Sequence, residues 1–575
     1  MPGINSILEM ASRALMAEQV ALEVTNHNLA NVNTPGYSRQ SAIFETTYPL
    51  PSPYGPLGTG VKVSGIERAF SELATVRLNQ NTASWAEYHT RQTLLEGVAA
   101  FFNETQEGGL DEALSAFFAA WHDVANNPSG SAERLVLLSK AQDLTEAFSF
   151  RANALVEART TVVQQVASLI QEINSHTAKL AQLNIDIQQM EAGGQAANDL
   201  RDQRQQELDR LAELIGIRYY TTAEGQVNVT LTNGTSVVQG PLAFNLDHQL
   251  TDNDTIAVIW QGPNGVTEDI TALLSGGKLT AQVRVRDVAL TQYQQDLDNL
   301  AQELIAQVNS QHTQGVGLSL FQDLSGTYSV TSAASPLNAA GLPFGDRISA
   351  GSLQIQVERD GAPLARGTIT VTPSMSLNEL VAAINTNPQI GGLVTASVDN
   401  NRLRLTANQA GDAFGFSQDT SQVLMALGVN TFFSGDKAYT LGLNPLVSDD
   451  PGKIAAGLLD PDTGARSVGD NRNALALTEL ENAAVVAVGS ENLTFLEAYN
   501  RLITDMGLEA QQAAGRADFH QSLKEQFQQM RDNVSGVSMD EELANLIKFQ
   551  RAYQAAARLI TVADELYQTL LALKR

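Results

Sequence analysis

The sequence predicts an α+β multidomain protein whose N- and C-terminal helices pair as an α-helical coiled coil. Apolar residues recur at a spacing of about 3.5 residues near both ends, as in a coiled-coil seam. Helical periodicity also dominates the middle of the chain, which predicts a long helical-bundle shaft. Two internal stretches alternate between apolar and polar residues, as half-buried strands do, and predict inserted β-rich outer domains. A chain of 575 residues with 43% hydrophobic content is long enough to form several such domains.

The terminal helices are expected at residues 4–31 and from residue 539 almost to the end of the chain. An isolated helix with one apolar stripe is marginally stable in water, so each stripe needs a partner. We expect the two ends to pair with each other and with copies of themselves. The spacing fits a hairpin within one chain equally well. The expected seam consists of Ile4, Leu8, Leu15, Leu22, Leu29, Phe549, Tyr553, Ile560, Tyr567 and Leu570.

A proline- and glycine-rich connector follows the first helix. Thr34 precedes Pro35, which disfavours helical backbone, and Pro35-Gly36 is typical of a turn. Residues 37–65 are therefore expected to be extended, with a short strand near 59–64.

The predicted elements between the two ends follow the order helix, β, helix, β, helix. The chain is therefore expected to run away from the terminal helices and return to them, so that its domains are built from separate segments. Asn-Gly pairs at 233–234 and 264–265 indicate turns beside strands at 227–231 and 255–260. A glycine- and serine-rich stretch at 315–351 is expected to link into the second β-rich region. The predicted domains are 1–35 with 535–575 (terminal coiled coil), 36–215 with 280–312 and 473–534 (helical shaft), 216–279 (β-rich subregion) and 325–440 (inserted outer β-rich domain).

Composition excludes several classes of function. The chain has no cysteine, which rules out disulfides, thiolate catalysis and cysteine metal sites. Its formal charge of -27 and its lack of a Lys/Arg cluster argue against nucleic-acid binding. We expect neither a cleavable secretory signal nor a membrane-spanning segment, because no basic-then-apolar start and no long apolar run occur.

No motif of an enzyme is present. The seven histidines lie apart, and none is four residues from another, as a zinc pair on a helix requires. Gly276-Gly277-Lys278 resembles the end of a phosphate loop, but Leu279 replaces the Ser or Thr that should follow, so a turn before a helix is expected. Asp252 and Asp254 lack the rest of a calcium loop. We expect no catalytic, cofactor-binding or metal-binding residues.

The stretch 26–37 resembles the N-terminal signature of bacterial flagellar rod, hook and hook-associated proteins. Residues 535–557 and 563–567 are similar to the C-terminus of the hook-associated proteins of the hook–filament junction, and residues 117–121 with Asn127-Pro128 resemble the start of that family's helical shaft. The signature residues are Asn28, Leu29, Ala30, Asn31, Asn33, Thr34, Pro35, Gly36 and Tyr37.

This resemblance implies a structural protein that polymerises at the distal end of the hook and joins hook to filament outside the cell. It implies uncleaved export through the flagellar type III apparatus. The implied partners are neighbouring subunits, the hook protein, a second junction protein (hook-associated protein 3) and an export chaperone at the C-terminal helix. It also implies terminal segments that become ordered on assembly. Two alternatives stay open: another axial protein, such as hook or distal rod, and an adhesin on an axial scaffold.

Overall fold

The computed structural model describes residues 2–52, 55–102, 108–460 and 462–573. The chain divides into two compact units, each built from separate segments. Unit 1 comprises Met1–Leu94, Thr161–Asp287 and Ala510–Arg575, and unit 2 comprises Leu95–Thr160 and Val288–Glu509. The long helices α2, α4 and α12 contribute residues to both units. The two ends of the chain belong to the same unit, although hundreds of residues separate them in sequence.

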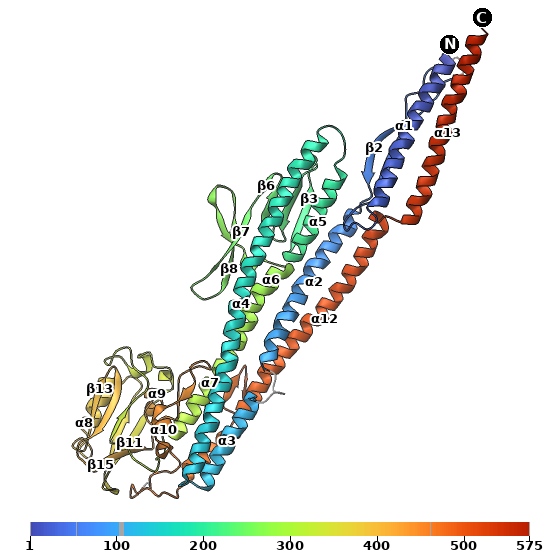
Figure 1. Ribbon diagram of the computed structural model, residues 1–575. Helices are drawn as coiled ribbons and strands as arrows, with labels where there is room; N and C mark the ends of the chain where they lie inside the picture. The colour runs from blue at the N-terminus through green and yellow to red at the C-terminus, as the bar shows by residue number, and fades with distance from the viewer. Residues whose placement is uncertain (1, 53–54, 103–107, 461, 574–575) are drawn as a thin grey trace. The chain divides into compact units, whose positions relative to one another are not determined.

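The terminal helices of unit 1 lie side by side, with both chain ends at the same end of the pair (Figure 1). Helix α1 ends just before the turn at 31–37, and the hairpin of β1 and β2 packs against it. Helix α12 ends at Ser535, and a glycine follows because a Cβ atom at position 536 would lie 2.4 Å from the carbonyl oxygen of Asp532. The bounds are α1 (Pro2–Ala30), β1 (Gln40–Thr46), β2 (Val61–Arg68), α2 (Glu72–Ala99), α12 (Phe495–Ser535) and α13 (Met539–Ala572).

Two small antiparallel sheets complete unit 1 and pack with α4 and α5 around a core of buried aliphatic residues. In β4, Val227, Val229 and Leu231 are buried at alternate positions, which is why this segment forms a strand. The strands expected at 227–231 and 255–260 are confirmed. The elements are α4 (Ser131–Glu191), α5 (Asn198–Leu214), β3 (Ile217–Thr221), β4 (Val227–Leu231), β5 (Ser236–Gln239), β6 (Leu242–Ala243), β7 (Asn245–Leu250), β8 (Ile256–Gln261), β9 (Thr267–Asp269) and α6 (Gly277–Arg284).

The phosphate-loop-like triplet is a turn before a helix, as expected. Gly276 and Gly277 have φ values of +73° and +80°, which favour glycine, and α6 begins at Gly277. The helix expected at 280–312 is also confirmed, with a π-helical turn (Val285–Ala289) between α6 and α7.

Unit 2 is centred on α7 and a cluster of aromatic rings. Phe117 and Trp121 of α3 pack against Phe432 and Phe433. Two three-stranded sheets, ordered β12-β11-β15 and β10-β14-β13, lie beyond this cluster. The elements are α3 (Leu110–Asn126), α7 (Leu290–His312), β10 (Asp323–Ser325), β11 (Gly351–Arg359), β12 (Ala362–Val371), α8 (Leu377–Asn385), β13 (Val394–Asp399), β14 (Arg402–Ala407), β15 (Asp412–Ser417), α9 (Val423–Leu427), β16 (Phe433–Ser434), β17 (Gly442–Leu443), α10 (Pro445–Asp449), α11 (Arg472–Glu479), β18 (Val486–Val488) and β19 (Glu491–Leu493).

Two expectations for unit 2 are wrong. The stretch 315–351 is not a simple linker, because Phe321, Leu337 and Phe344 within it are buried. The helix expected from residue 473 is interrupted by the β18–β19 hairpin, whose turn includes Gly489 at φ +59°. Valines favour a strand and Gly489 closes the hairpin, so local backbone preference outweighs the helical pattern on either side.

His312 fixes the end of α7 from a fully buried position. The backbone N–H of Ala455 donates to its Nε2 at 3.0 Å, so its Nδ1–H donates to the carbonyl of Asn430 at 2.8 Å. Burial lowers the pKa of His312 to about 4. The imidazole is therefore neutral in the folded protein at neutral pH.

We expect acid to destabilise unit 2 through His312. The unfolded chain binds a proton near pH 6.5 and the folded chain only near pH 4. The contribution of neutral His312 to the free energy of unfolding is therefore complete above pH 6.5. It is lost as the pH falls toward 4, and the total loss is about 3 kcal/mol. Unfolding by urea should be measured from pH 4 to 7.5 in wild type, His312→Gln and, as control, His122→Gln. An identical pH slope in all three proteins would contradict the prediction.

Candidate functional site

The terminal helices bury several small residues, whereas their large apolar residues stay partly open. Ala11, Ala17 and Ala21 of α1 and Ala556 and Ala563 of α13 are buried. Small side chains let two helix backbones approach closely. The expected seam residues Ile4, Leu8, Leu15, Leu22, Leu29, Phe549, Ile560 and Leu570 are half-buried, and Tyr553 and Tyr567 are 38% and 49% exposed.

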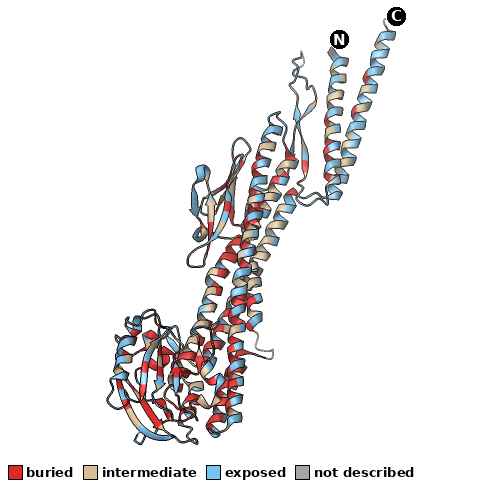
Figure 2. Cartoon of the chain, turned by 60° about the vertical axis from the view of Figure 1, so that its left-hand side comes forward, coloured by how far each residue is buried: buried red, intermediate tan, exposed pale blue. Residues whose placement is uncertain are grey.

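The apolar surface of α13 extends beyond that seam. Exposed and half-buried residues dominate this helix (Figure 2). Leu559, Val562 and Leu566 follow one another at steps of three and four, so they form a second stripe on the helix. Their exposed fractions are 50%, 49% and 45%. Within one chain, α13 therefore presents more apolar surface than α1 covers.

Asn28 is the central residue of the axial signature. It is buried, and its side-chain amide uses its full hydrogen-bonding capacity. Its Nδ2 donates to the carbonyl of Gln40 at 2.8 Å and to the Glu542 carboxylate at 3.0 Å. Its Oδ1 accepts from the Gln40 backbone N–H at 2.9 Å and from the Tyr37 hydroxyl at 2.7 Å. One side chain thus connects α1, the turn, β1 and the first turn of α13.

The rest of the signature shapes the turn that brings Tyr37 to Asn28. Asn31 donates to the carbonyl of His27 at 3.0 Å and accepts from the Thr34 hydroxyl at 3.1 Å. Gly36 has φ +77°, and a side chain there would meet Gln206, which donates to the carbonyl of Pro35 at 2.9 Å. Leu29 is half-buried, while Ala30, Asn33, Thr34 and Pro35 are exposed.

Charged residues just outside the signature complete this arrangement, which we call the anchor. Glu542 is only 2% exposed, and Arg39 pairs with it at 3.1 Å and with Glu541 at 2.8 Å. A buried carboxylate is tolerated when it is paired and hydrogen-bonded. The anchor residues are Asn28, Tyr37, Ser38, Arg39, Gln40, Asp202, Glu541 and Glu542.

The anchor also connects to α5. Asp202 accepts from the backbone N–H of Ser38 at 2.8 Å and from its hydroxyl at 2.7 Å, and it pairs with Arg68 at 2.7 Å. Burial, followed by the negative charges of Asp199, Asp202 and Glu542, raises the pKa of Tyr37, which keeps its hydroxyl protonated as a donor to Asn28. Sequence reasoning missed Ser38, Arg39, Gln40 and Asp202. The one available signal was the acidic cluster at 540–542, which needed a basic partner.

No catalytic centre was expected. In the described part of the chain, no three His, Cys, Asp or Glu residues are grouped so that they could hold a metal ion. The helices of the described ranges include none that is both long and apolar enough to span a membrane.

Comparison with known proteins relates these features to a family. The model described as the flagellar hook-associated protein FlgK helical domain matches residues 95–326. The models of the flagella basal body rod protein and of the flagellar basal body rod FlgEFG protein C-terminal match residues 8–37 and 528–573. Flagellar hook-associated protein 1 of Salmonella typhimurium is 26% identical, over 99% of this chain and all of that protein. The chain is therefore similar to flagellar hook-associated protein 1 over its whole length.

Further comparisons give the same result. Flagellar hook-associated protein 1 of Bacillus subtilis is 25% identical over 97% of this chain and 96% of that protein. The structure of the flagellar hook junction protein FlgK from Burkholderia pseudomallei shares the fold, with a TM-score of 0.53 over 80% of this chain and all of that chain, at 17% identity. The protein is a structural axial component of the bacterial flagellum, exported outside the cell. The matches at 8–37 and 528–573 contain half of the anchor residues, namely Asn28, Tyr37, Glu541 and Glu542.

We expect Asn28→Ala to detach the start of α13 from α1. The substitution removes one hydrogen bond from the Glu542 carboxylate and two from the Gln40 backbone, at a cost of about 2–4 kcal/mol. Hydrogen exchange should therefore quicken at residues 37–42 and 539–546. Asn33→Ala is the matched control, since Asn33 is exposed. Equal exchange rates in the two variants would show that the anchor does not hold the helices together.

Proposed function

We propose that this protein polymerises at the distal end of the hook and joins the hook to the filament. The observation that carries the proposal is the open apolar surface of the terminal helix pair. Tyr553 and Tyr567 lie on the seam but stay 38% and 49% exposed, and Leu559, Val562 and Leu566 form a second stripe beside it. In an assembled layer, the terminal helices of neighbouring subunits cover these residues.

The anchor gives this assembly a defined geometry. Asn28, Arg39 and Glu542 fix where α13 begins relative to α1, so the two stripes are presented together rather than on independent segments. A preorganised pair loses less conformational entropy on binding than two free helices. The coiled-coil seam expected from the sequence is, in this proposal, completed by neighbouring copies.

The partners that we propose follow from a position between two structures. The hook protein contacts one side of the layer, and the second junction protein, hook-associated protein 3, contacts the other. The matches of both ends to rod-protein models support an inner layer that resembles the rest of the axial structure.

We expect the double substitution Tyr553→Ser and Tyr567→Ser to block assembly without unfolding the subunit. Exposed residues contribute little to the stability of the free chain, whereas aromatic residues at an interface often dominate its binding energy. Purified protein should be added to isolated hook–basal bodies that lack junction proteins, and their tips imaged by electron microscopy. We expect tip coverage to fall more than about tenfold.

Tyr439→Ser is the control, because Tyr439 is 62% exposed and lies in unit 2, away from the seam. Removal of residues 1–30 or 540–575 should abolish the caps. Wild-type coverage by the double variant would contradict the role of the seam. Bare tips with intact wild-type protein would place the chain elsewhere along the axial structure.

We also propose that an export chaperone covers α13 before assembly, because its exposed leucines and valines would otherwise promote aggregation. Leu559→Ser with Val562→Ser and Leu566→Ser should weaken chaperone binding more than about tenfold in calorimetric titration. Leu364→Ser, at a 44% exposed site in unit 2, should leave it unchanged. Retained binding after deletion of residues 530–575 would refute this proposal.

A further inference from the structure

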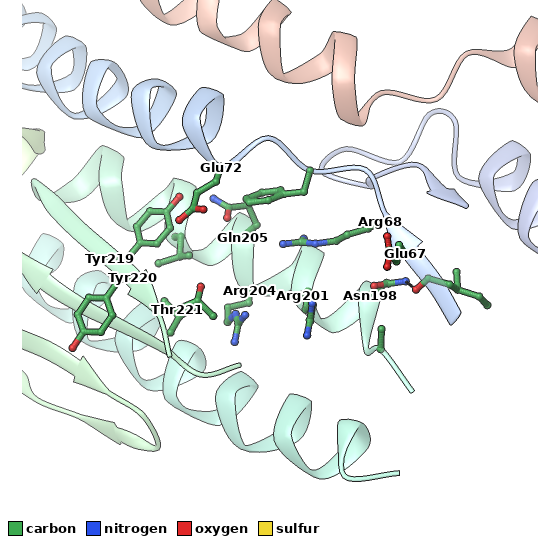
Figure 3. A pocket seen from close by; sticks show the side chains of 15 residues that line it. Glu67, Arg68, Glu72, Asn198, Arg201, Arg204, Gln205, Tyr219, Tyr220 and Thr221 are labelled. Atoms are coloured by element: carbon green, nitrogen blue, oxygen red, sulfur yellow. Dashed lines mark hydrogen bonds between the residues drawn. The ribbon is translucent and has the colours of Figure 1, made fainter. Parts of the chain in front are cut away.

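Unit 1 contains a cavity of 660 Å³ that the assembly described above does not use. It lies between the end of β2, the first half of α5 and β3 (Figure 3). The rings of Phe70 and Tyr219 form part of its wall, and three arginines, Arg68, Arg201 and Arg204, line it as well. A cavity that combines aromatic walls with clustered guanidinium groups has the composition of an anion-binding site.

Two of the three arginines already have acidic partners. Arg68 pairs with Asp202 at 2.7 Å, and its guanidinium carbon lies 4.4 Å from the ring centre of Phe70. Arg201 donates from Nη2 to one carboxylate oxygen of Glu191 at 2.8 Å, and its Nε forms an ion pair with the other oxygen at 2.8 Å. These two charges are compensated within the chain.

Arg204 is different. It is 6% exposed, and its Nη1 donates only to neutral acceptors, namely the Asn184 side-chain oxygen at 3.0 Å and the carbonyl of Gly225 at 2.8 Å. Among the residues that the structure describes, no carboxylate oxygen lies within 4.0 Å of its nitrogens. Burial, together with repulsion from Arg201 and Arg68, lowers its pKa to about 10 despite the attraction of the Glu191 carboxylate, so Arg204 remains a cation at neutral pH.

A buried cation with no carboxylate in direct contact destabilises a fold unless another group supplies that contact. We propose that the cavity binds an oxyanion, a carboxylate or a phosphate group, which pairs with Arg204. The body of the ligand would lie against Phe70 and Tyr219. Glu67 and Glu72 also line the cavity and repel further negative charge, so the ligand carries a single anionic group.

Two sources could supply this group. One is a small organic anion or phosphate in solution. The other is an acidic side chain of a second copy of the chain, and this source rests on the proposed assembly. The cavity lies next to the anchor, since Asp202 contacts both Arg68 and Ser38. An occupied cavity would therefore stabilise the segment from which the terminal helices extend.

The first arm of the test measures the thermal unfolding of the full chain with inorganic phosphate or benzoate, against chloride at equal ionic strength. We expect a saturable rise of about 2–4 °C with at least one of the two anions. In Arg204→Met, the anions should no longer raise the unfolding temperature. In chloride, this variant should unfold at the wild-type temperature or above. Arg210→Met on the same helix should keep the full rise, because the Arg210 side chain is 68% exposed. Calorimetric titration of wild type should give one site per chain, which does not depend on any variant folding.

The second arm compares wild type and Arg204→Met in capping hook tips. Lost capping by the variant, with unchanged monomer stability and no response to small anions, assigns the anion to a neighbouring subunit. A response to small anions assigns it to solution. If wild type shows no anion response and either caps no better than the variant or does not cap at all, the site is refuted. A uniform loss of stability in Arg204→Met, with the anion response retained, would make Arg204 structural. A wild-type protein that does not cap hook tips counts against the proposed function. Binding of small anions is judged separately, from the anion response of the monomer.

Discussion

The side-chain amide of Asn28 connects four parts of unit 1, and the geometry of both chain ends depends on it. It meets two backbone groups of Gln40, the Tyr37 hydroxyl and the Glu542 carboxylate in a buried position. Each of these groups would be costly to bury alone, and together they leave few unsatisfied donors or acceptors. Because Glu542 lies in the first turn of α13, the same contacts determine where the C-terminal helix begins. The ends of the chain are thus positioned by a polar network as well as by apolar packing.

A second constraint comes from the division between small and large side chains on the terminal helices. Alanines of α1 and α13 are buried, whereas the leucines and tyrosines of these helices are half-buried or exposed. A globular protein would bury such residues in its own core. A subunit of a polymer must instead keep them available for its neighbours. The two ends therefore combine a fixed starting point, given by the anchor, with incomplete apolar coverage further along the helices.

His312 of unit 2 and Arg204 of unit 1 are both buried basic side chains, but they differ in charge at neutral pH. His312 is kept neutral by burial, and both of its ring nitrogens are satisfied by backbone groups. Arg204 cannot lose its charge at neutral pH, and its contacts are to neutral oxygens. The first arrangement is complete within the chain, whereas the second leaves a charge for an external group to compensate. This difference is what distinguishes a structural residue from a candidate binding residue here.

The sequence by itself determined the family, the helical ends and several strands, because these depend on local order. The stretch from Asn28 to Tyr37 is contiguous, and so are the apolar repeats of α1 and α13 and the alternation of β4. Tertiary structure alone decided which residues the signature contacts. Asp202 and Glu542 come from distant segments, and no periodicity relates them to the signature. It also decided that small residues, and not the leucines, are the fully buried ones on the terminal helices, since burial depends on which groups lie against each position. The β18–β19 hairpin and the cavity around Arg204 have the same origin: both arise from contacts that form only when the chain is folded.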